Sequence, residues 1–322
     1  MKYLARFCIW QNTRPVVFFK VIEDINASGY GLTFGLHTRV DERVQDAVTA
    51  IEAGNIYINR NQIGAIVESQ PFGGKKLSGT GPKAGGPHYL LRFLKERDTK
   101  SDTTKTSNKQ LNDKQSGTVS LQTASTGEPL IPHIKSLLDT LPDQLQFCSK
   151  EITNALEHAK AHFHTTIDLP GPTGESNRLS MEPAGTVLCL NGGNVAHWLA
   201  QTVQCLALGN AAIMAGADSD EYSVVIANWL KDYNTGTLQG IDATADSEAL
   251  TEVLNTTHLD AVATVDLPQL IKAVRKTLAD RSGPIVTLAT SLFDISPLID
   301  EKSLCVDTTA AGGNASLLAA AS

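Results

Sequence analysis

The chain has 322 residues, of which 42% are hydrophobic and 19% charged, so it carries enough apolar side chains to bury the cores of two ordinary domains. Its net charge of −7 is unevenly spread: residues 1–97 carry 13 basic against 8 acidic side chains, and residues 98–322 carry 14 against 26. The basic surplus of the first part contains no Lys/Arg run, so we expect no nucleic-acid partner.

Targeting and membrane signals are absent from the sequence pattern. No stretch reaches the roughly 18 to 20 uninterrupted apolar residues of a membrane helix, and Arg6, Asn12 and Arg14 interrupt the opening where a signal peptide would need an apolar core. We therefore expect a cytoplasmic protein without a transmembrane segment. Five cysteines lack any CxxC or ligand spacing, which favours reduced, buried thiols; they are Cys8, Cys148, Cys189, Cys205 and Cys305.

The first 97 residues alternate helices and strands. Apolar spacing predicts helices over Val21–Asn26 and Asp41–Ala53, with a loop and strand around Tyr30–His37 between them. Period-two alternation predicts a half-buried strand over Asn55–Asn59, and the glycine-rich segment Arg60–Pro87 reads as a long loop. An ordered loop of that length is usually functional.

A polar stretch then divides the chain. Between Asp98 and Gly117 the only large apolar residue is Leu111, so burial cannot offset the entropy of ordering this segment. We predict a flexible linker over residues 98–120, with one unit before it and another over residues 121–322.

The second unit reads as an α/β domain. A continuous apolar run, an Asn-Gly-Gly-Asn turn, a helix and a second apolar run predict one right-handed βαβ unit. Further helices and a late strand are consistent with an α/β sheet. The predicted elements are helices over Ile134–Leu141, Gln144–His164, Val195–Leu208 and Leu267–Arg281, and strands over Gly185–Leu190, Ala211–Ala215 and Ile285–Leu288.

Two motifs could carry chemistry, and each has a plainer reading. The turn Asn191–Asn194 could cradle a phosphate at a helix N-terminus, but it is not the GxGxxG fingerprint and the acidic run Asp218–Glu221 follows it, which favours a structural turn. His158 and His162 have the spacing of a zinc pair on a helix, yet without an HExxH glutamate a solvated polar face is the stronger reading.

Longer motifs resemble one family. The segment from Lys20 to Leu94 resembles the last part of the L-glutamate γ-semialdehyde dehydrogenase module of proline utilization A, through Ala-Ser-Gly-Tyr-Gly-Leu-Thr-Phe-Gly from Ala27, Pro-Phe-Gly-Gly from Pro71 and Gly-Thr-Gly-Pro-Lys-Ala-Gly-Gly-Pro from Gly79. Leu-Pro-Gly-Pro-Thr-Gly-Glu-Ser-Asn-Arg from Leu169 is similar to the extra carboxy-terminal domain of longer family members. The resemblance implies an incomplete aldehyde dehydrogenase catalytic domain in residues 1–97, followed by an aldehyde-dehydrogenase-like α/β domain.

The resemblance also implies a chemistry that this chain does not complete. In the family a cysteine thiolate attacks the aldehyde, hydride passes to NAD and a glutamate-activated water releases the acid. None of the five cysteines has the family's nucleophile setting, and residues 1–18 do not match, so we expect no catalytic residue and no cofactor site here. NAD is expected for the intact enzyme, and FAD only for a proline dehydrogenase module that this sequence does not contain.

The resemblance places substrate binding in the long loop. Backbone around Gly64 and Ala65 is implied to receive the substrate α-carboxylate, and Phe72 to pack on its aliphatic chain; a tight turn is the alternative. Two positions depart from the family: Glu68 replaces a common glycine, and Lys75-Lys76 replaces a glycine-containing pair.

Three hypotheses follow. The chain is a fragment of the dehydrogenase that needs the upstream half of its parent as partner and assembles as a homo-oligomer. Alternatively it is a non-catalytic module that covers the active site of a separately encoded half. The third, an independent nucleotide-binding enzyme, rests on the Asn191–Asn194 turn alone. Whether the gene is truncated, frameshifted or a short variant stays open.

Overall fold

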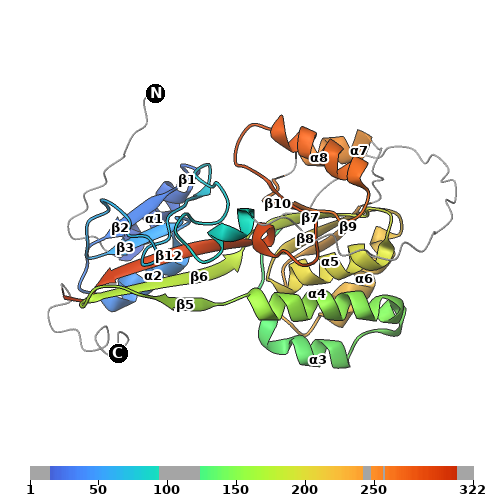
Figure 1. Cartoon of the computed structure of the whole chain (residues 1–322), viewed down its shortest axis with the longest axis horizontal. Coiled ribbons are helices and arrows are strands. Elements are labelled where there is room, and N and C mark those ends of the chain that lie inside the picture. The colour runs from blue at the N-terminus through green and yellow to red at the C-terminus, as the bar shows by residue number, and fades with distance from the viewer. Residues whose placement is uncertain (1–14, 94–123, 242–247, 257, 310–322) are drawn as a thin grey trace.

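The computed structural model describes residues 15–93, 124–241, 248–256 and 258–309, and shows a mixed α/β fold. Two five-stranded sheets lie side by side in it, one mixed and one parallel, and long strands lead from the first toward the second (Figure 1). The predicted linker, residues 98–120, lies outside the described residues.

The parallel sheet has the strand order β11-β10-β7-β8-β9. Its centre is the predicted βαβ unit, in which β7 and β8 pair in parallel across α5. The chain leaves β7 toward β8 on one side and later returns to β10 on the other. The elements are β7 (Thr186–Leu190), α5 (Val195–Ala207), β8 (Ala211–Ala215), α6 (Ser219–Trp229), β9 (Leu238–Ile241), α7 (Glu248–Thr256), β10 (Ala261–Ala263), α8 (Pro268–Ala279) and β11 (Thr287–Ala289).

Helices cover both faces of this sheet, which is why its central strands β7, β8 and β10 are buried along their whole length. Val187 and Cys189 of β7 face a core formed with α4, α5 and α6, whereas Leu188 and Leu190 face α7 and α8. Figure 1 shows the two helical layers on opposite sides of the sheet. The first layer begins with η2 (Ile131–His133), α3 (Ile134–Asp139), η3 (Asp143–Cys148) and α4 (Ser149–His162).

The mixed sheet has the order β2-β3-β12-β6-β5 and draws its strands from distant parts of the chain. β12 pairs in parallel with β3 and antiparallel with β6, which forms a hairpin with β5 around Pro170–Gly174. The strands are β2 (Thr33–Leu36), β3 (Asn55–Ile58), β5 (Thr166–Leu169), β6 (Glu175–Pro183) and β12 (Ile299–Asp307), the last preceded by η4 (Ser296–Leu298).

The two faces of the mixed sheet have different covers. Ile56 and Ile58 of β3 and Val306 of β12 lie in a core with α1 (Pro15–Asn26) and α2 (Asp41–Ala50). The alternate residues of the strands point the other way, toward the Arg60–Pro87 loop. That loop contains β4 (Lys75–Lys76), which pairs with β1 (Tyr30–Gly31), and is followed by η1 (Tyr89–Phe93).

The structure corrects several predicted element bounds. The second helix ends at Ala50 instead of Ala53, because Ile51 is already extended. The last predicted strand lies at Thr287–Ala289, and the long helix predicted from Gln144 opens as a 3₁₀ turn and becomes α-helical only at Ser149. No helix in the part of the chain that the structure describes is long and apolar enough to cross a membrane.

Candidate functional site

The Arg60–Pro87 loop folds back on itself over the mixed sheet. Phe72 pairs with Ala84 through two backbone hydrogen bonds of 2.9 Å, and the Asn55 side chain of β3 donates to the Gly73 carbonyl at 3.0 Å. A Cβ added at Gly54 would lie 2.0 Å from the Gly73 oxygen, so a glycine there lets the loop approach the sheet.

One carboxylate of the β5–β6 hairpin, the distal hairpin, bonds to both ends of residues 60–70, the first part of the loop. Glu175 Oε2 accepts from Arg60 Nη1 at 2.9 Å, and Glu175 Oε1 accepts from Gln70 Nε2 at 2.7 Å. The Arg60 guanidinium lies 5.3 Å from the Tyr57 ring centre and donates to Cys305 Sγ at 3.0 Å. β3, the loop, β6 and β12 therefore meet in one largely buried polar cluster.

A second ionic cluster lies under β4. Lys75 Nζ and Lys302 Nζ each lie 2.5 Å from a different oxygen of Glu182, and Asp300 lies 3.7 Å from Lys75. Burial would raise the pKa of Glu182, but the two ammonium groups outweigh it and lower that pKa. Burial raises the pKa of Asp300 in spite of Lys75.

A third cluster fixes the end of the loop. The backbone N–H of Lys83 donates to Glu301 Oε2 at 2.7 Å, and His88 Nδ1 lies 2.5 Å from Glu301 Oε1. The Lys83 side chain is buried and its amine donates to the Gly73 carbonyl. Burial lowers the pKa of Lys83 to about 7, with Glu301 only partly opposing the shift.

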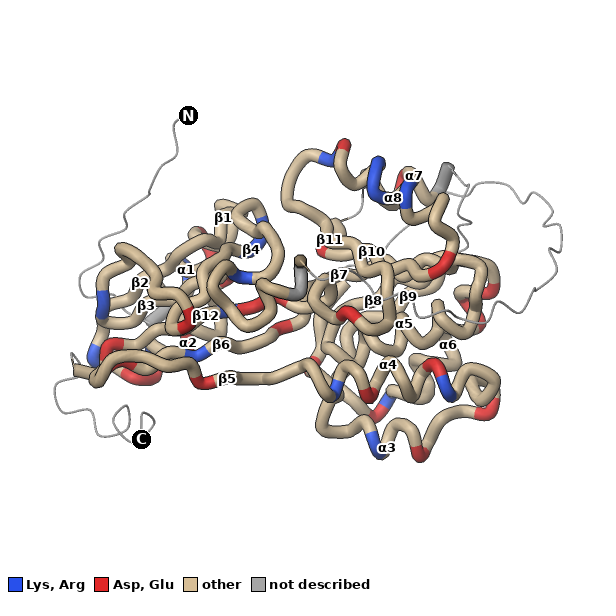
Figure 2. The backbone as a smooth tube through the Cα atoms, viewed as in Figure 1, with Lys and Arg blue, Asp and Glu red and all other residues tan. Residues whose placement is uncertain are grey.

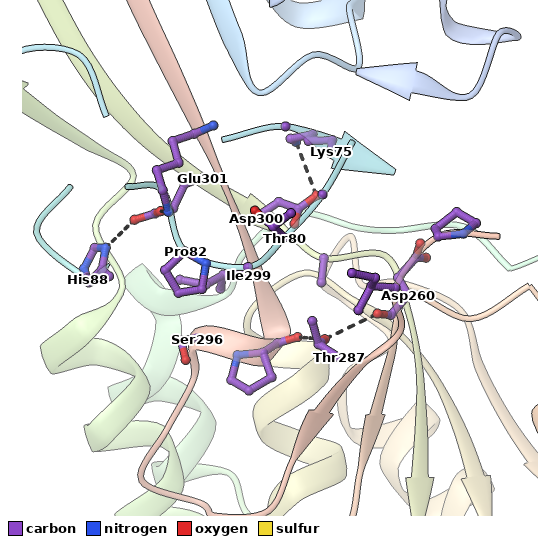
Figure 3. Close-up of a pocket in the computed structure, with 18 of the residues that line it drawn as sticks. Lys75, Thr80, Pro82, His88, Asp260, Thr287, Ser296, Ile299, Asp300 and Glu301 are labelled. Carbon is purple, nitrogen blue, oxygen red and sulfur yellow. Dashed lines mark hydrogen bonds and ion pairs between the residues drawn. The ribbon is translucent and has the colours of Figure 1, made fainter. Parts of the chain in front are cut away.

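The second and third clusters border a cavity of about 390 Å³ between the loop and the parallel-sheet unit. Figure 3 shows Lys75 reaching Asp300 and His88 reaching Glu301 on the loop side, with Thr287 bonded to the Asp260 carbonyl on the other. Each of these polar groups already has a protein partner on its own side of the cavity.

Two ion pairs join the oppositely charged parts of the sequence. Arg60 and Lys75 come from the first part of the chain and pair with Glu175 and Glu182 of the second. Blue and red segments meet where the loop crosses β12 and β6 (Figure 2). The basic surplus before the linker and the acidic surplus after it are thus complementary across a contact inside the protein.

The predicted substrate residues lie in the same loop. Gly64 and Ala65 are exposed, Gly64 adopts φ +77°, and no atom lies within 4 Å of a Cβ built at Gly64. Phe72 is half-buried. The neighbouring side chains of Ile63 and Val67 are 86% and 72% exposed, so this apolar stretch has an open surface over the anchored base of the loop.

Both departures from the family pattern lie at left-handed backbone positions. Glu68 adopts φ +71° and Lys76 adopts φ +53°, conformations that favour glycine. This geometry gives a physical reason for the glycines that the family has there. The Lys76 side chain forms an ion pair with Glu52.

The described cysteines do not have the properties of a nucleophile. All four are buried, and burial raises the pKa of Cys148 and of Cys305 to about 11. Cys205 also has a raised pKa, through its hydrogen bond with Cys189 at 3.7 Å and its burial. A reactive thiolate needs exposure and a lowered pKa. Cys8 lies outside the described residues.

The Asn191–Asn194 turn does not fit a dinucleotide pyrophosphate. The Asn194 side chain already accepts from the backbone N–H groups of Ala196 and His197, the donors that a phosphate would use. A Cβ built at Gly192 would lie 1.9 Å from the Val265 oxygen, which accounts for that glycine by packing.

The histidine pair has a packing role. The rings of His158 and His162 lie 4.0 Å apart, and Phe293 contacts the His158 ring edge-on. Across residues 15–93, 124–241, 248–256 and 258–309, no three His, Cys, Asp or Glu side chains gather to hold a metal ion.

Sequence reasoning missed the residues that clamp the loop: Glu175, Glu182, Asp300 and Glu301. Their spacing in the chain carries no local signal, because only the pairing of β12 with β3 and β6 brings them to the loop. The one available clue was the opposite charge of the two parts.

Comparison with known proteins agrees with this geometry. Residues 18–101 match the aldehyde dehydrogenase family. "Bifunctional protein PutA" of Salmonella typhimurium is 35% identical over 306 residues, 93% of this chain and 21% of that protein. "1-Pyrroline-5-carboxylate dehydrogenase" of Staphylococcus saprophyticus is 42% identical over 80 residues, 25% of this chain and 16% of that protein.

The fold comparison points the same way. The structure of Proline Utilization A from Corynebacterium freiburgense matches with a TM-score of 0.51 at 19% identity, covering 90% of this chain and 24% of that one. The chain spans about a fifth of the length of the PutA relatives that it matches. The predicted fold class and the predicted resemblance are thereby confirmed: residues 18–101 match the aldehyde dehydrogenase family, and most of the chain is similar to a part of proline utilization A.

Proposed function

We propose that this chain supplies the substrate-anchoring loop and the assembly domain of an NAD-dependent L-glutamate γ-semialdehyde dehydrogenase in proline catabolism. In this proposal the catalytic thiol and the dinucleotide site belong to an upstream half of the parent enzyme, and the chain alone is inactive. Residues 1–97 are the end of the dehydrogenase domain, residues 98–120 a linker, and residues 121–322 a carboxy-terminal aldehyde-dehydrogenase-like domain.

The observation that carries the proposal is the anchored loop itself. Its ends are fixed by Glu175 and Glu301, while Gly64 and Ala65 remain exposed between them. Small residues on a rigid base let backbone N–H groups approach a carboxylate closely. The half-buried Phe72 ring would pack on the aliphatic chain of the substrate and exclude water from the aldehyde.

A second function draws on the shared sheet. β12 and the β5–β6 hairpin come from the distal domain, yet they extend the sheet that begins with β2 and β3. This observation favours a non-catalytic module. Such a module would cover the active site of a separate dehydrogenase half and would take part in homo-oligomer assembly. The two functions differ in whether the loop of this chain contacts substrate.

The test is NADH formation from glutamate semialdehyde. We expect no NADH from this chain alone, and cysteine-dependent NADH formation once the upstream half of an intact relative is fused before α1. Turnover by the unfused chain, lost on replacing one of its own cysteines, would contradict the proposal. A folded fusion that binds NAD but does not oxidise the semialdehyde would favour the structural module.

A further inference from the structure

We infer that Glu175 is a positioning residue for the substrate-anchoring loop: its carboxylate holds both ends of residues 61–69, so that the distal hairpin sets substrate affinity. The inference rests on the proposed function of that loop. It goes beyond the covering role of the distal domain, because it assigns the link between that domain and substrate affinity to one side chain and one loop segment.

The geometry of the carboxylate fits this role. Its two oxygens accept from different ends of the segment, Oε2 from Arg60 and Oε1 from Gln70. Gln70 connects Glu175 to the middle of the segment, because its Oε1 accepts from the backbone N–H of Ile66 at 3.2 Å. The chain of bonds therefore runs from the hairpin to the residue next to Ala65.

The surroundings make Glu175 hard to replace. Asn177 Nδ2 donates to Glu175 Oε1 at 2.9 Å and so orients the carboxylate. The side chains of Arg60 and Glu175 are each only 15% exposed, so water competes weakly for this ion pair. In Glu175→Gln, the amide N–H₂ group would face either Arg60 or the amide groups of Gln70 and Asn177. These groups are all donors, so one set of hydrogen bonds would be lost.

The segment itself has few other restraints. Residues 61–68 are all exposed, so burial contributes little to holding them. Among the described residues, their other hydrogen bonds are local, such as Asn61 Oδ1 accepting from Ile63 N, apart from Glu68 N donating to the Gly85 carbonyl at 3.1 Å. Loss of the Glu175 clamp should therefore loosen the segment while the sheet beneath it stays folded.

The first arm of the test is amide hydrogen exchange on the full chain, comparing the parent with Glu175→Gln. We expect exchange over residues 61–70 to quicken about tenfold in this variant, with β3 and β12 unchanged. Asp168→Asn is the matched control, because Asp168 lies on the same hairpin and pairs with Arg178 on the surface. Parent-like exchange over residues 61–70 in Glu175→Gln would overturn the inference, whatever the kinetics of the fusion show.

The second arm uses the active fusion. Glu175→Gln should raise the KM for the semialdehyde about tenfold and leave kcat within about twofold, the pattern of lost binding. General destabilisation would instead lower the active fraction and hence kcat. A parent-like KM would overturn the inference even if the loop exchanges faster. A fusion without any activity would count against the proposed function. The hydrogen-exchange measurement would still show whether Glu175 holds residues 61–70.

Discussion

Asn55 of β3 stands opposite Ser303 of β12 in a parallel register, although the two residues come from the two parts of the chain that the polar stretch separates. The pairing continues through Ile56 and Leu304. A parallel pair requires a long connection, and here the entire parallel-sheet unit lies in that connection. The two parts therefore share one sheet and one buried core.

Proteolysis tests this shared sheet. Cleavage should occur first between Asp98 and Gly117, because that polar stretch has too few apolar residues to be held by burial. We expect the two nicked pieces to stay together in native size-exclusion chromatography and to separate only in denaturant. Separate elution of the pieces in native buffer would show that the β3–β12 pairing does not hold them together.

The left-handed backbone of Glu68 predicts an unusual mutational result. A non-glycine residue there costs about 1 to 2 kcal/mol, which exceeds the roughly 0.5 to 1 kcal/mol of extra unfolded-state entropy that glycine brings. Glu68→Gly should therefore raise the free energy of unfolding slightly, or leave it unchanged. The measurement is urea denaturation followed by circular dichroism.

Glu157→Gly provides the matched control for that variant. Glu157 is an exposed glutamate inside α4, where glycine should lower the free energy of unfolding by about 1 kcal/mol. Equal destabilisation by both substitutions would mean that the φ of Glu68 carries no strain.

The buried amine of Lys83 predicts a pH dependence. Its folded pKa of about 7 lies below the ordinary value of 10.5, so between these values the unfolded state binds more protons than the folded state. The contribution of Lys83 to the free energy of unfolding should then rise from pH 7 to about pH 10.

Lys83→Met removes this titration. We expect the stability of the variant relative to the parent to fall as the pH is raised over that window, measured by urea denaturation at pH 7, 8.5 and 10. Lys160→Met, at an exposed position on α4, should show a difference that stays constant with pH. If the difference for Lys83→Met also stayed constant with pH, the pKa of Lys83 in the folded protein would not be lowered, contrary to this account.

The elements that sequence analysis predicted well are those with local signals. The apolar run before Asn191, the helix from Val195 and the run from Ala211 specify the βαβ unit without reference to the rest of the chain. The loop was equally visible, because its glycines and prolines exclude regular structure over a long stretch.

Beyond β2 and β3, which the sequence predicted, the mixed sheet could not be predicted in the same way. β6 and β12 mix charged residues such as Glu175 and Glu301 with buried apolar ones, because these charged side chains bond to a loop that is distant in sequence. Alternation alone does not specify that partner. The clamp residues were missed for this reason, and the family resemblance supplied the substrate residues Gly64, Ala65 and Phe72, which remain a prediction.

The most direct test of the account is the KM of the active fusion for glutamate semialdehyde after Ala65→Asp. The account predicts a strongly raised KM, because the new carboxylate would repel the carboxylate of the substrate. Phe72→Ala should lower kcat/KM by roughly 10- to 200-fold through lost apolar contact. Asn154→Asp, which adds the same charge on the exposed face of α4, should leave both constants unchanged. Parent-like kinetics for Ala65→Asp and Phe72→Ala would contradict the account, since the loop would then be scaffolding that never contacts the substrate.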